Sequence, residues 1–372
     1  MDIAIFGAGI AGLTSAITLR AHGHRCRVYE RNRQAQDAGM GFIVVPEAIE
    51  FLHGLGVDLE GAGTRLERYL CRDSAGQVLH EQTIPVGARG ILRRDLITAL
   101  TRGLNGDTSV VFAGLKDLQF NGNCSVTSAQ VTAGAGEERI QADVFVSAEG
   151  VNSQARQTLF PDWPVMPDRI QEVVGLVRCE KAVHWAKNNL NKFHAEEGGL
   201  SLGILPVDAQ QVVWYLQFDS QRFPLSVEAT YGSGAAAAEA RRAFVEKRVG
   251  AWAHPVPSLI AAADFSRVHL WRPVETELIP RFHRANLVLA GDAAHPLSPF
   301  TSQGVSSAIG DAVALAAAVD AVARGKATLE SALSGYSSER HAKCAPFVAK
   351  GREMSRDFLA PLATKSLLLP IA

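Results

Sequence analysis

The residues that could do chemistry begin near the start of the chain, where three glycines precede an acidic residue. Residues 7–12 read Gly-Ala-Gly-Ile-Ala-Gly, and Glu30 follows further on. In such a turn the first glycine permits a tight bend, the second lets backbone approach a pyrophosphate, and the third lets a helix pack on a strand. The helix N-terminus favours the diphosphate, and the Glu30 carboxylate can hold a ribose diol. These residues predict that the chain binds a dinucleotide.

The elements around this turn are the ones that the motif needs. Residues 3–6 form a short apolar run typical of a buried strand, residues 13–21 are an uninterrupted helical stretch, and residues 25–29 read as a second strand that ends at Glu30. A glycine-rich loop without a ligand is the alternative interpretation. The strand, helix, second strand and terminal acid together favour a dinucleotide site, but they do not distinguish NAD from FAD.

A second turn near residue 290 identifies the cofactor. The apolar strand 286–290 leads into Gly-Asp-Ala-Ala-His-Pro over 291–296, and Gln303-Gly304 opens a long apolar helix that ends near residue 323. This segment closely resembles the GDAAHP…GQG segment of the class A flavin monooxygenases, the p-hydroxybenzoate hydroxylase family. The resemblance implies non-covalent FAD, with Asp292 at its ribityl chain and the N–H groups at the helix start near its pyrimidine edge. A helix N-terminus stabilises the negative charge that reduced flavin carries there.

Three further segments resemble this family in the family's order. Residues 142–156 resemble the strand-plus-DG fingerprint, residues 91–96 the RxxL segment, whose arginine approaches the flavin nucleotide, and residues 39–43 the GxGI loop beside the isoalloxazine. The matches extend over nearly the whole chain. The cofactor-binding residues that the resemblance implies are Gly7, Gly9, Ile10, Ala11, Gly12, Glu30, Arg31, Gly41, Ile43, Arg93, Glu149, Gly150, Asp292, Gln303, Gly304, Val305 and Ser306.

Four positions depart from the family pattern. Glu149 replaces the usual aspartate, Ser302 replaces the first glycine of GQG, Ser306 stands where many relatives have asparagine, and Gly310 where glutamate is usual. The departures could tune redox behaviour or flavin mobility, or be neutral. We hypothesise that Glu149 serves the reductive half-reaction, with a turn or helix cap as the alternative.

The resemblance also implies an activity. In the family NAD(P)H reduces FAD, O₂ forms a C4a-hydroperoxide, and its distal oxygen passes to an electron-rich carbon. We therefore expect a single-component FAD-dependent NAD(P)H:O₂ monooxygenase that hydroxylates a small or mid-sized aromatic or heteroaromatic compound. The alternatives are an FAD-dependent oxidoreductase of the same fold without oxygen insertion, and a flavin-binding protein without turnover. A flavin halogenase would show a WxWxIP motif, which this sequence lacks.

Candidate catalytic residues come from one loop and from the strands of a second domain. The loop 296–302 is expected against the flavin face with Pro299 nearest C4a, although Pro299 could be a plain loop proline. Polar side chains in apolar strands could orient or deprotonate a substrate hydroxyl, or could instead face outward from their strands; they are His194, Ser201, Tyr215 and Gln217. We expect a structural role for His295, and core or pocket-wall positions for Trp163, Trp185 and Trp214.

Composition limits the class of protein. The chain has 372 residues, 47% of them hydrophobic, and a net charge of −1, which is typical of a soluble globular protein and gives no electrostatic basis for binding nucleic acid or an anionic membrane. Five scattered cysteines without a CxxC indicate a reducing, cytoplasmic location and no metal site. Because the first strand is expected to begin at residue 2 or 3, we expect no signal peptide. The apolar stretches 308–323 and 359–372 are too interrupted to span a bilayer. We expect the second of them to be a helix packed over the flavin domain, with contact to a membrane surface as the alternative. The expected assembly is a monomer or homodimer.

These elements predict an α/β fold: a Rossmann-like FAD-binding domain with an inserted antiparallel β-sheet substrate domain and C-terminal helices. The chain is expected to enter and leave the flavin domain repeatedly. The expected segments are 1–71, 89–160 and 281–330 for the FAD-binding domain, 72–88 and 161–280 for the substrate domain, and 331–372 for the C-terminal helical segment.

Overall fold

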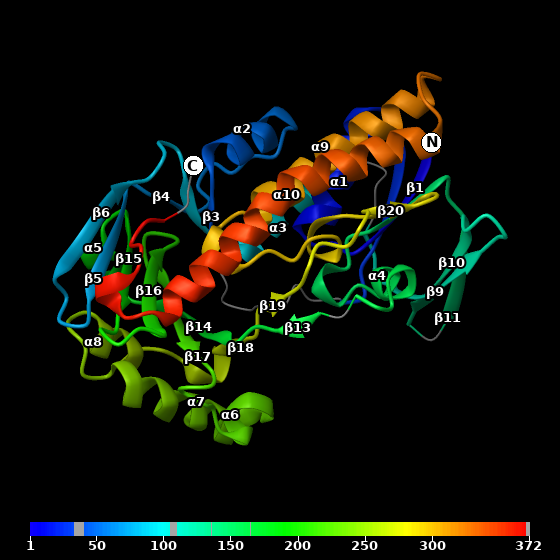
Figure 1. Ribbon diagram of the computed structural model, residues 1–372. Coiled ribbons are helices and arrows are strands. Elements are labelled where there is room, and N and C mark those ends of the chain that lie inside the picture. Colours follow the sequence, from blue (N-terminus) through cyan, green and yellow to red (C-terminus); the bar gives the residue numbers. More distant parts are fainter. Residues whose placement is uncertain (33–40, 105–109, 135, 164, 370–372) are drawn as a thin grey trace.

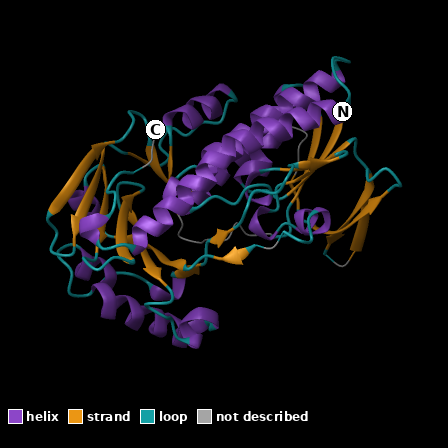
Figure 2. Ribbon diagram, viewed as in Figure 1, coloured by secondary structure: helices purple, strands orange, loops and turns teal. Residues whose placement is uncertain are grey.

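The computed structural model describes residues 1–32, 41–104, 110–134, 136–163 and 165–369. Strands gather toward the two ends of the molecule, and long helices run between them (Figure 2). The two longest, α9 (Gly304–Ala323) and α10 (Leu329–Leu359), pack on each other, and α10 continues from the flavin-domain sheet to the substrate sheet (Figure 1).

The flavin-domain sheet is parallel except at one edge. The strand 3–6 and the strand 25–29 form as predicted, with Ile3 opposite Cys26 on one side and Val144 on the other. Only the β20–β21 pair is antiparallel among the described strands of this sheet. In order the strands are β20 (His283–Arg284), β21 (Leu287–Leu289), β12 (Val144–Ser147), β1 (Asp2–Phe6), β2 (Arg25–Tyr29) and β8 (Val110–Val111).

Helices form a layer beside this sheet. Helix α9 is long and apolar enough to cross a membrane by length and composition alone. It packs between α1 (Ile10–Ala21) and α10, and Leu315 and Val319 on it are fully buried, so its apolar surface belongs to the protein core. The other helices of the flavin domain are α2 (Pro46–Gly54), α3 (Arg93–Gly103) and α4 (Gln154–Leu159).

A three-stranded antiparallel meander caps the flavin domain. Its strands are β9 (Gly114–Phe120), β10 (Val126–Ala133) and β11 (Gly136–Ile140). The Asn286 amide fastens the meander to the main sheet: its Nδ2 donates to the Val126 carbonyl at 2.9 Å, and its Oδ1 accepts from the Val126 N–H at 2.7 Å. Because Asn286 directly precedes β21, this contact ties the meander to the sheet edge.

The substrate sheet is built from two separate parts of the chain. Its strand order is β18 (His269–Trp271), β14 (Ile170–Arg178), β17 (Gln211–Asp219), β16 (Leu200–Pro206), β15 (Asn189–His194), β5 (Arg68–Asp73) and β6 (Val78–Thr83). The prediction of an antiparallel sheet is wrong at one pair, since β5 and β15 run parallel, with Tyr69 opposite Leu190. Strand β5 comes from the early part of the chain, whereas β15 follows β14 and α5, so no hairpin joins the two and nothing forces them to run antiparallel. Strand β5 also begins before the boundary expected at residue 72.

The two faces of this sheet differ, with the period of two that a strand dictates. On β17, Trp214, Leu216 and Phe218 are fully buried in a core shared with α5 (Glu180–Ala186), α7 (Gly234–Val249) and α8 (Val256–Ala261). The alternate residues of β17 face the flavin domain instead. Burial of each large apolar side chain contributes roughly 1.5–3 kcal/mol, so the helical side holds the sheet and leaves the other face available for a ligand.

The end of the chain departs from the sequence prediction. Helix α10 ends at Leu359, and beyond it only Leu362–Thr364 forms a short 3₁₀ turn, so the predicted helix over the leucine-rich end is wrong for residues 360–369. Pro361 favours this stop, because the residue before a proline is disfavoured in the helical conformation, and Ala360 is extended with ψ 155°. We call residues 360–369 the C-terminal strap. Its Leu369 N–H donates to Gln82 Oε1 and its carbonyl accepts from Gln82 Nε2, both at 2.9 Å.

The remaining elements are short. A small sheet of β3 (Gly41–Val44), β7 (Arg89–Leu92) and β4 (Thr64–Arg65) lies where the two domains meet. The pair β13 (Met166–Pro167) and β19 (Val274–Glu275) marks the passages into and out of the inserted domain, and α6 (Val227–Tyr231) precedes α7.

Candidate active site

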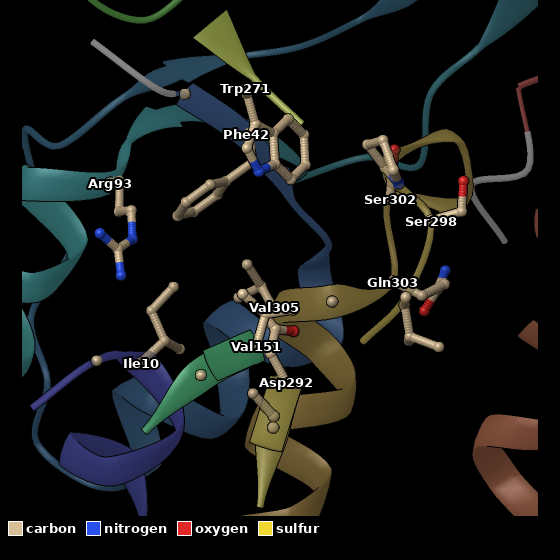
Figure 3. A pocket seen from close by; sticks show the side chains of 18 of the residues that line it. Ile10, Phe42, Arg93, Val151, Trp271, Asp292, Ser298, Ser302, Gln303 and Val305 are labelled. Carbon is tan, nitrogen blue, oxygen red and sulfur yellow. The ribbon is translucent and has the colours of Figure 1, made fainter. Parts of the chain in front are cut away.

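A cavity of about 1150 Å³ lies between the flavin-domain sheet and the substrate sheet, and both domains line it. In Figure 3, Ile10, Val151, Asp292 and Val305 border one side of this space, and Phe42 and Trp271 lie opposite them. Arg93 closes the view at one side, and Ser298, Ser302 and Gln303 at the other.

The glycine turn at residues 7–12 has the close approaches that its sequence predicts. Gly7 has φ +104°, and a Cβ there would lie 2.2 Å from the Ala148 carbonyl oxygen. A Cβ on Gly12 would lie 1.9 Å from the Gly7 carbonyl oxygen, so Gly12 is required for packing inside the turn. At Gly9 the nearest atom to such a Cβ is an Arg93 nitrogen at 3.9 Å. The backbone at Gly9 is therefore open to the approach of a ligand. The first turn of α1 has no side-chain cap, and its N–H groups can therefore meet a diphosphate.

Glu30 stands at the end of β2 beside this turn. Its carboxylate accepts the Ala8 N–H and the Asn32 N–H, each at 2.8 Å. These bonds hold the carboxylate against the glycine turn, where the ribose next to a bound diphosphate would lie. Arg31 lines the same end of the cavity.

Arg93 and Asp292 approach the cavity from different elements. Arg93 opens α3 directly after β7, and its guanidinium points into the space above Ile10 (Figure 3). Asp292 lies deep in the molecule with its side chain open to the cavity. Burial raises the pKa of Asp292, while the charges of His295, Arg93 and Arg156 act to lower it.

The start of α9 forms another side of the cavity. The preceding residue Ser302 has φ +53°, a left-handed conformation that glycine adopts without cost, which explains why the family pattern favours glycine there. Gln303 occupies the N-cap position without a side-chain hydrogen bond, and Gly304 and Val305 line the cavity. The helix N-terminus is therefore available to a ligand, as expected for the flavin edge.

A buried ionic cluster fixes the loop that carries Asp292. Asp311 accepts from Arg340 Nε on one oxygen and from the Gly291 N–H on the other, each at 2.7 Å, and His295 Nε2 also lies 2.7 Å from that second oxygen. Burial disfavours protonated His295, but Asp311 outweighs this and raises the pKa of His295 well above its usual value. Burial likewise acts against ionised Asp311, yet His295 and Arg340 lower its pKa. The cluster joins this loop to α9 and α10, in agreement with a structural role for His295.

Gly310 makes room for this cluster. A Cβ at Gly310 would lie 2.9 Å from both terminal nitrogens of Arg340, whose Nε is held by Asp311. The Arg340 guanidinium therefore occupies the space that a side chain at position 310, such as the family's usual glutamate, would need.

The geometry of Glu149 favours a cap. Its Oε2 accepts from the Ser147 hydroxyl at 2.8 Å, the Ser153 hydroxyl at 3.1 Å and the Ala155 N–H at 3.2 Å, although Glu149 also lines the cavity. Arg156 is buried nearby and donates to the Asp292 carbonyl at 3.1 Å. This fingerprint therefore joins two turns of the flavin domain.

Polar side chains cross the inner face of the substrate sheet in neighbouring rows. In one row His194, Ser201, Gln217, Glu172 and Trp271 stand opposite one another on successive strands. Gln217 Nε2 donates to Glu172 Oε1 at 2.6 Å, and the Ser201 hydroxyl donates to Gln217 Oε1 at 3.2 Å. Ser201, Gln217 and Glu172 therefore form a hydrogen-bonded chain across three neighbouring strands.

The next row contains Lys192, Gly203 and Tyr215. The Tyr215 ring lies across Gly203, where a Cβ would come within 2.0 Å of the ring. The Lys192 ammonium lies 5.1 Å from the centre of the Phe300 ring, on the loop next to Pro299. Lys192 therefore bridges from the substrate sheet toward the loop expected at the flavin face.

Burial shifts the pKa values of these groups. It raises the pKa of Glu172 to about 7, although the Gln217 hydrogen bond and Lys192 oppose the shift, and it lowers the pKa of Lys192 to about 8. It raises the pKa of Tyr215. It also lowers the pKa of His194 well below its usual value, so His194 is neutral. Within the described part of the chain, neither ring nitrogen of His194 has a hydrogen-bond partner.

The cavity brings together most of the residues that the sequence predicts. Pro299, His194, Tyr215 and Gln217 line it, as do the expected cofactor residues except Gly12 and Ser306. Those two do not line it: Gly12 is buried in the turn, and Ser306 is half-buried in the first turn of α9. Ser201 is buried beneath Gln217. Trp163, Trp185 and Trp214 lie outside the lining, and Gly39 and Met40 lie outside the described residues.

Among the cavity-lining residues that sequence reasoning missed are Glu172, Lys192, Trp271 and Lys365. A signal was present for two of them. Glu172 is a charged residue within a largely apolar strand, and Lys192 shares a strand face with His194. Lys365 belongs to the strap, which was expected to be helical, and nothing in the sequence near Trp271 places it at the cavity.

Comparison with known proteins agrees with this site. A family model described as an FAD binding domain matches residues 1–350. The chain is 28% identical to the phenazine 1,6-dicarboxylic acid hydroxylase PhzS of Lysobacter antibioticus (85% of this chain, 81% of that protein) and 29% identical to the 3-amino-4-hydroxybenzoate 2-monooxygenase of Streptomyces cremeus (96% and 88%). The crystal structure of Klebsiella pneumoniae HpxO complexed with FAD and uric acid has a TM-score of 0.81 at 23% identity, covering 96% of this chain and 88% of that one.

The chain therefore belongs to the family of the FAD binding domain. The predicted family, fold class and FAD cofactor are confirmed, and the chain is an enzyme of the FAD-dependent monooxygenase class.

Proposed function

We propose that this chain is a single-component monooxygenase that hydroxylates a small or mid-sized aromatic or heteroaromatic compound. The observation that carries the proposal is the single cavity that joins the FAD-binding turns to a polar sheet face. When bound, FAD would accept a hydride from NAD(P)H, activate O₂ and supply one oxygen atom to the substrate ring. The hydroxylated compounds in the names of the relatives are aromatic or heteroaromatic, which supports this substrate class.

Residues of the flavin domain would bind FAD, and residues of the substrate sheet would bind the substrate. Glu30 would hold the adenosine ribose, the first turn of α1 the diphosphate, and Arg93 the nucleotide from above. Asp292 and the N-terminus of α9 would hold the flavin end. The Pro299 loop would lie between flavin and substrate, and the strap would exclude bulk water from that side of the cavity.

On the substrate side, one row of polar groups can orient a ring hydroxyl and receive its proton. Glu172 has a pKa of about 7 and connects through Gln217 to Ser201. A carboxylate with such a pKa can accept a proton at neutral pH. Removal of that proton would raise the electron density of the ring carbon that receives oxygen.

FAD binding and oxygen insertion test the proposal separately. Asp292→Ala should lose much of the FAD, whereas Asp162→Ala, at an exposed position outside the cavity lining, should keep it. With ¹⁸O₂, product should carry one labelled oxygen. Turnover that yields unlabelled product would support an oxidoreductase of the same fold, and FAD binding without substrate-stimulated NAD(P)H oxidation would support a protein without turnover.

The setting of the enzyme is part of the proposal. All five cysteines are free, which suits a reducing cytoplasmic location. Assembly as a monomer or homodimer stays a prediction.

A further inference from the structure

Lys192 places a positive charge in the wall of the substrate cavity without giving it a protein anion to bind. Among the described residues its ammonium has no hydrogen-bond partner, and it lies over the face of the Phe300 ring, 5.1 Å from the ring centre. A buried cation is costly unless it is paired and hydrogen-bonded. An anion that binds in the cavity beside Lys192 would therefore offset the free-energy cost of leaving this cation unpaired.

The acid nearest to Lys192 does not neutralise the region. Glu172 is 5% exposed and already accepts a hydrogen bond from Gln217 Nε2 at 2.6 Å. A second cation, Lys365 on the C-terminal strap, lines the same cavity, and its Nζ donates to the Phe358 carbonyl at 3.2 Å. Near the strap, Lys350 is paired with Glu353 at 2.8 Å. Two acids share the substrate end of the cavity with Lys192 and Lys365. Glu172 is bound to Gln217, and Asp357 accepts the Ser366 N–H at 3.1 Å and acts on Lys365, so neither acid is bonded to Lys192.

His194 supplies the second, independent observation. It is 6% exposed, stands two residues from Lys192 on the same strand face and lines the cavity. Neither of its ring nitrogens has a hydrogen-bond partner within the described residues. Buried polar groups are nearly always hydrogen-bonded, so an unpartnered one facing a cavity indicates a ligand that completes it. A neutral imidazole can donate one hydrogen bond and accept another.

We propose that the substrate is an aromatic carboxylic acid, bound as its anion, with its carboxylate on Lys192 and completed by His194. The ring would then lie between the substrate sheet and the Pro299 loop, with Trp271 and Phe42 along the aromatic wall of the cavity. Lys192 is a specificity-determining residue in this arrangement, and Lys365 adds positive charge from the strap. This inference rests on the proposed monooxygenase function and narrows its substrate class.

The test compares acids with their neutral amides on FAD-loaded enzyme. The probes are benzoate and benzamide, 4-hydroxybenzoate and 4-hydroxybenzamide, and 1-naphthoate and 1-naphthamide, titrated at pH 7 by the change in flavin fluorescence. Because charge-assisted hydrogen bonds are roughly twice as strong as neutral ones, we expect at least one acid to bind about tenfold more tightly than its amide. In Lys192→Met the ratio should fall to about one, and in Lys192→Arg part of it should return.

Controls separate the site from general effects. Lys326→Met, at an exposed position beyond α9, should keep the wild-type ratio. Lys192→Gln serves if the methionine variant does not fold, with FAD content and circular dichroism as the checks. Ratios near one in the wild type, no measurable binding of any acid, or a ratio unchanged in both neutral variants would overturn the proposal. In each of those cases, ¹⁸O incorporation into a neutral aromatic would leave the monooxygenase function standing.

Discussion

At the scale of single residues, the two sides of the cavity use charge differently. On the flavin side Asp311 binds both His295 and Arg340, and these bonds hold the loop that carries Asp292. On the substrate side Glu172 is buried and Lys192 is half-buried, with no direct bond between them, and the pKa values of both shift toward 7. Such shifts are typical of sites that exchange protons or bind a charged ligand.

The raised pKa of Glu172 predicts a pH-dependent cost to folding. Its pKa is 4.5 in the reference state and about 7 in the fold, so the folded state is relatively most stable below about pH 4.5 and loses stability as pH rises toward 7. Glu172→Gln cannot ionise. Its free energy of unfolding should therefore exceed that of the wild type above pH 7, by up to about 3 kcal/mol, and the gap should close at acid pH.

Urea denaturation across pH 5–8 measures this difference. Glu239→Gln, on the exposed face of α7, is the matched control and should follow the wild-type curve. A constant gap between Glu172→Gln and the wild type over this range would show that Glu172 does not titrate as its burial requires.

For Glu149 the structure favours a structural role, whereas the sequence suggested a role in flavin reduction. Three donors converge on its Oε2, so we now expect it to act as a cap. Glu149→Gln should lower stability by about 1 kcal/mol, because one charged acceptor is lost, with FAD content and the rate of flavin reduction preserved. Thermal unfolding and stopped-flow reduction by NAD(P)H measure the two effects. Slower reduction at unchanged stability would restore the catalytic role.

At the scale of elements, the turn into α9 combines a strained residue with a helix N-terminus. Ser302 holds φ +53°, which costs a residue with a side chain roughly 1–2 kcal/mol relative to its right-handed form. Ser302→Gly should therefore raise the free energy of unfolding by about 0.5–1 kcal/mol after the entropy cost of glycine is subtracted.

Ser306→Gly is the control for this prediction, since it lies within the first turns of the same helix. There glycine should lower stability by about 0.5–1 kcal/mol. Thermal unfolding of both FAD-loaded variants measures the contrast, and two changes of the same sign would contradict it.

The elements also show what the sequence could and could not predict. The glycine turns, β1, α1 and α9 are local patterns, and the residues that carry them are contiguous, so the cofactor side followed from the sequence. Glu172, Lys192 and Trp271 reach one cavity only through the register of strands far apart in the chain. Periodicity states which residues alternate but not which face meets the flavin domain, and therefore the substrate side could not be completed.

At the scale of the whole molecule, the C-terminal strap joins the last helix to the far edge of the substrate sheet. The Gly199 N–H donates to the Phe358 carbonyl at 2.8 Å, and the Leu362 N–H donates to the Glu196 carbonyl at 2.8 Å. The Gln82 side chain forms two hydrogen bonds with the Leu369 backbone. Because strap residues line the cavity, their attachment controls how open that side is to water.

Gln82→Ala should release the end of the strap. We expect a larger fraction of NAD(P)H to be consumed without product, because water and solvent protons would reach the reacting flavin more easily. The measurement is the ratio of hydroxylated product to NAD(P)H oxidised. Gln119→Ala, on the exposed meander strand β9, should leave the ratio unchanged. An unchanged ratio in both variants would mean that the strap does not shield the cavity.

The parallel pairing of β5 with β15 has a consequence for exchanging substrate preference between relatives. Two separate segments of the chain contribute strands to the sheet that faces the substrate: residues 68–83 form one edge, and the other strands come from beyond residue 165. If only the later segment were exchanged, β15 of the relative would pair with the original β5, and the side chains along this strand pair would not be complementary. A working chimera has to transplant both stretches together, and for the same reason substitutions on either side of that seam are expected to evolve as compensating pairs.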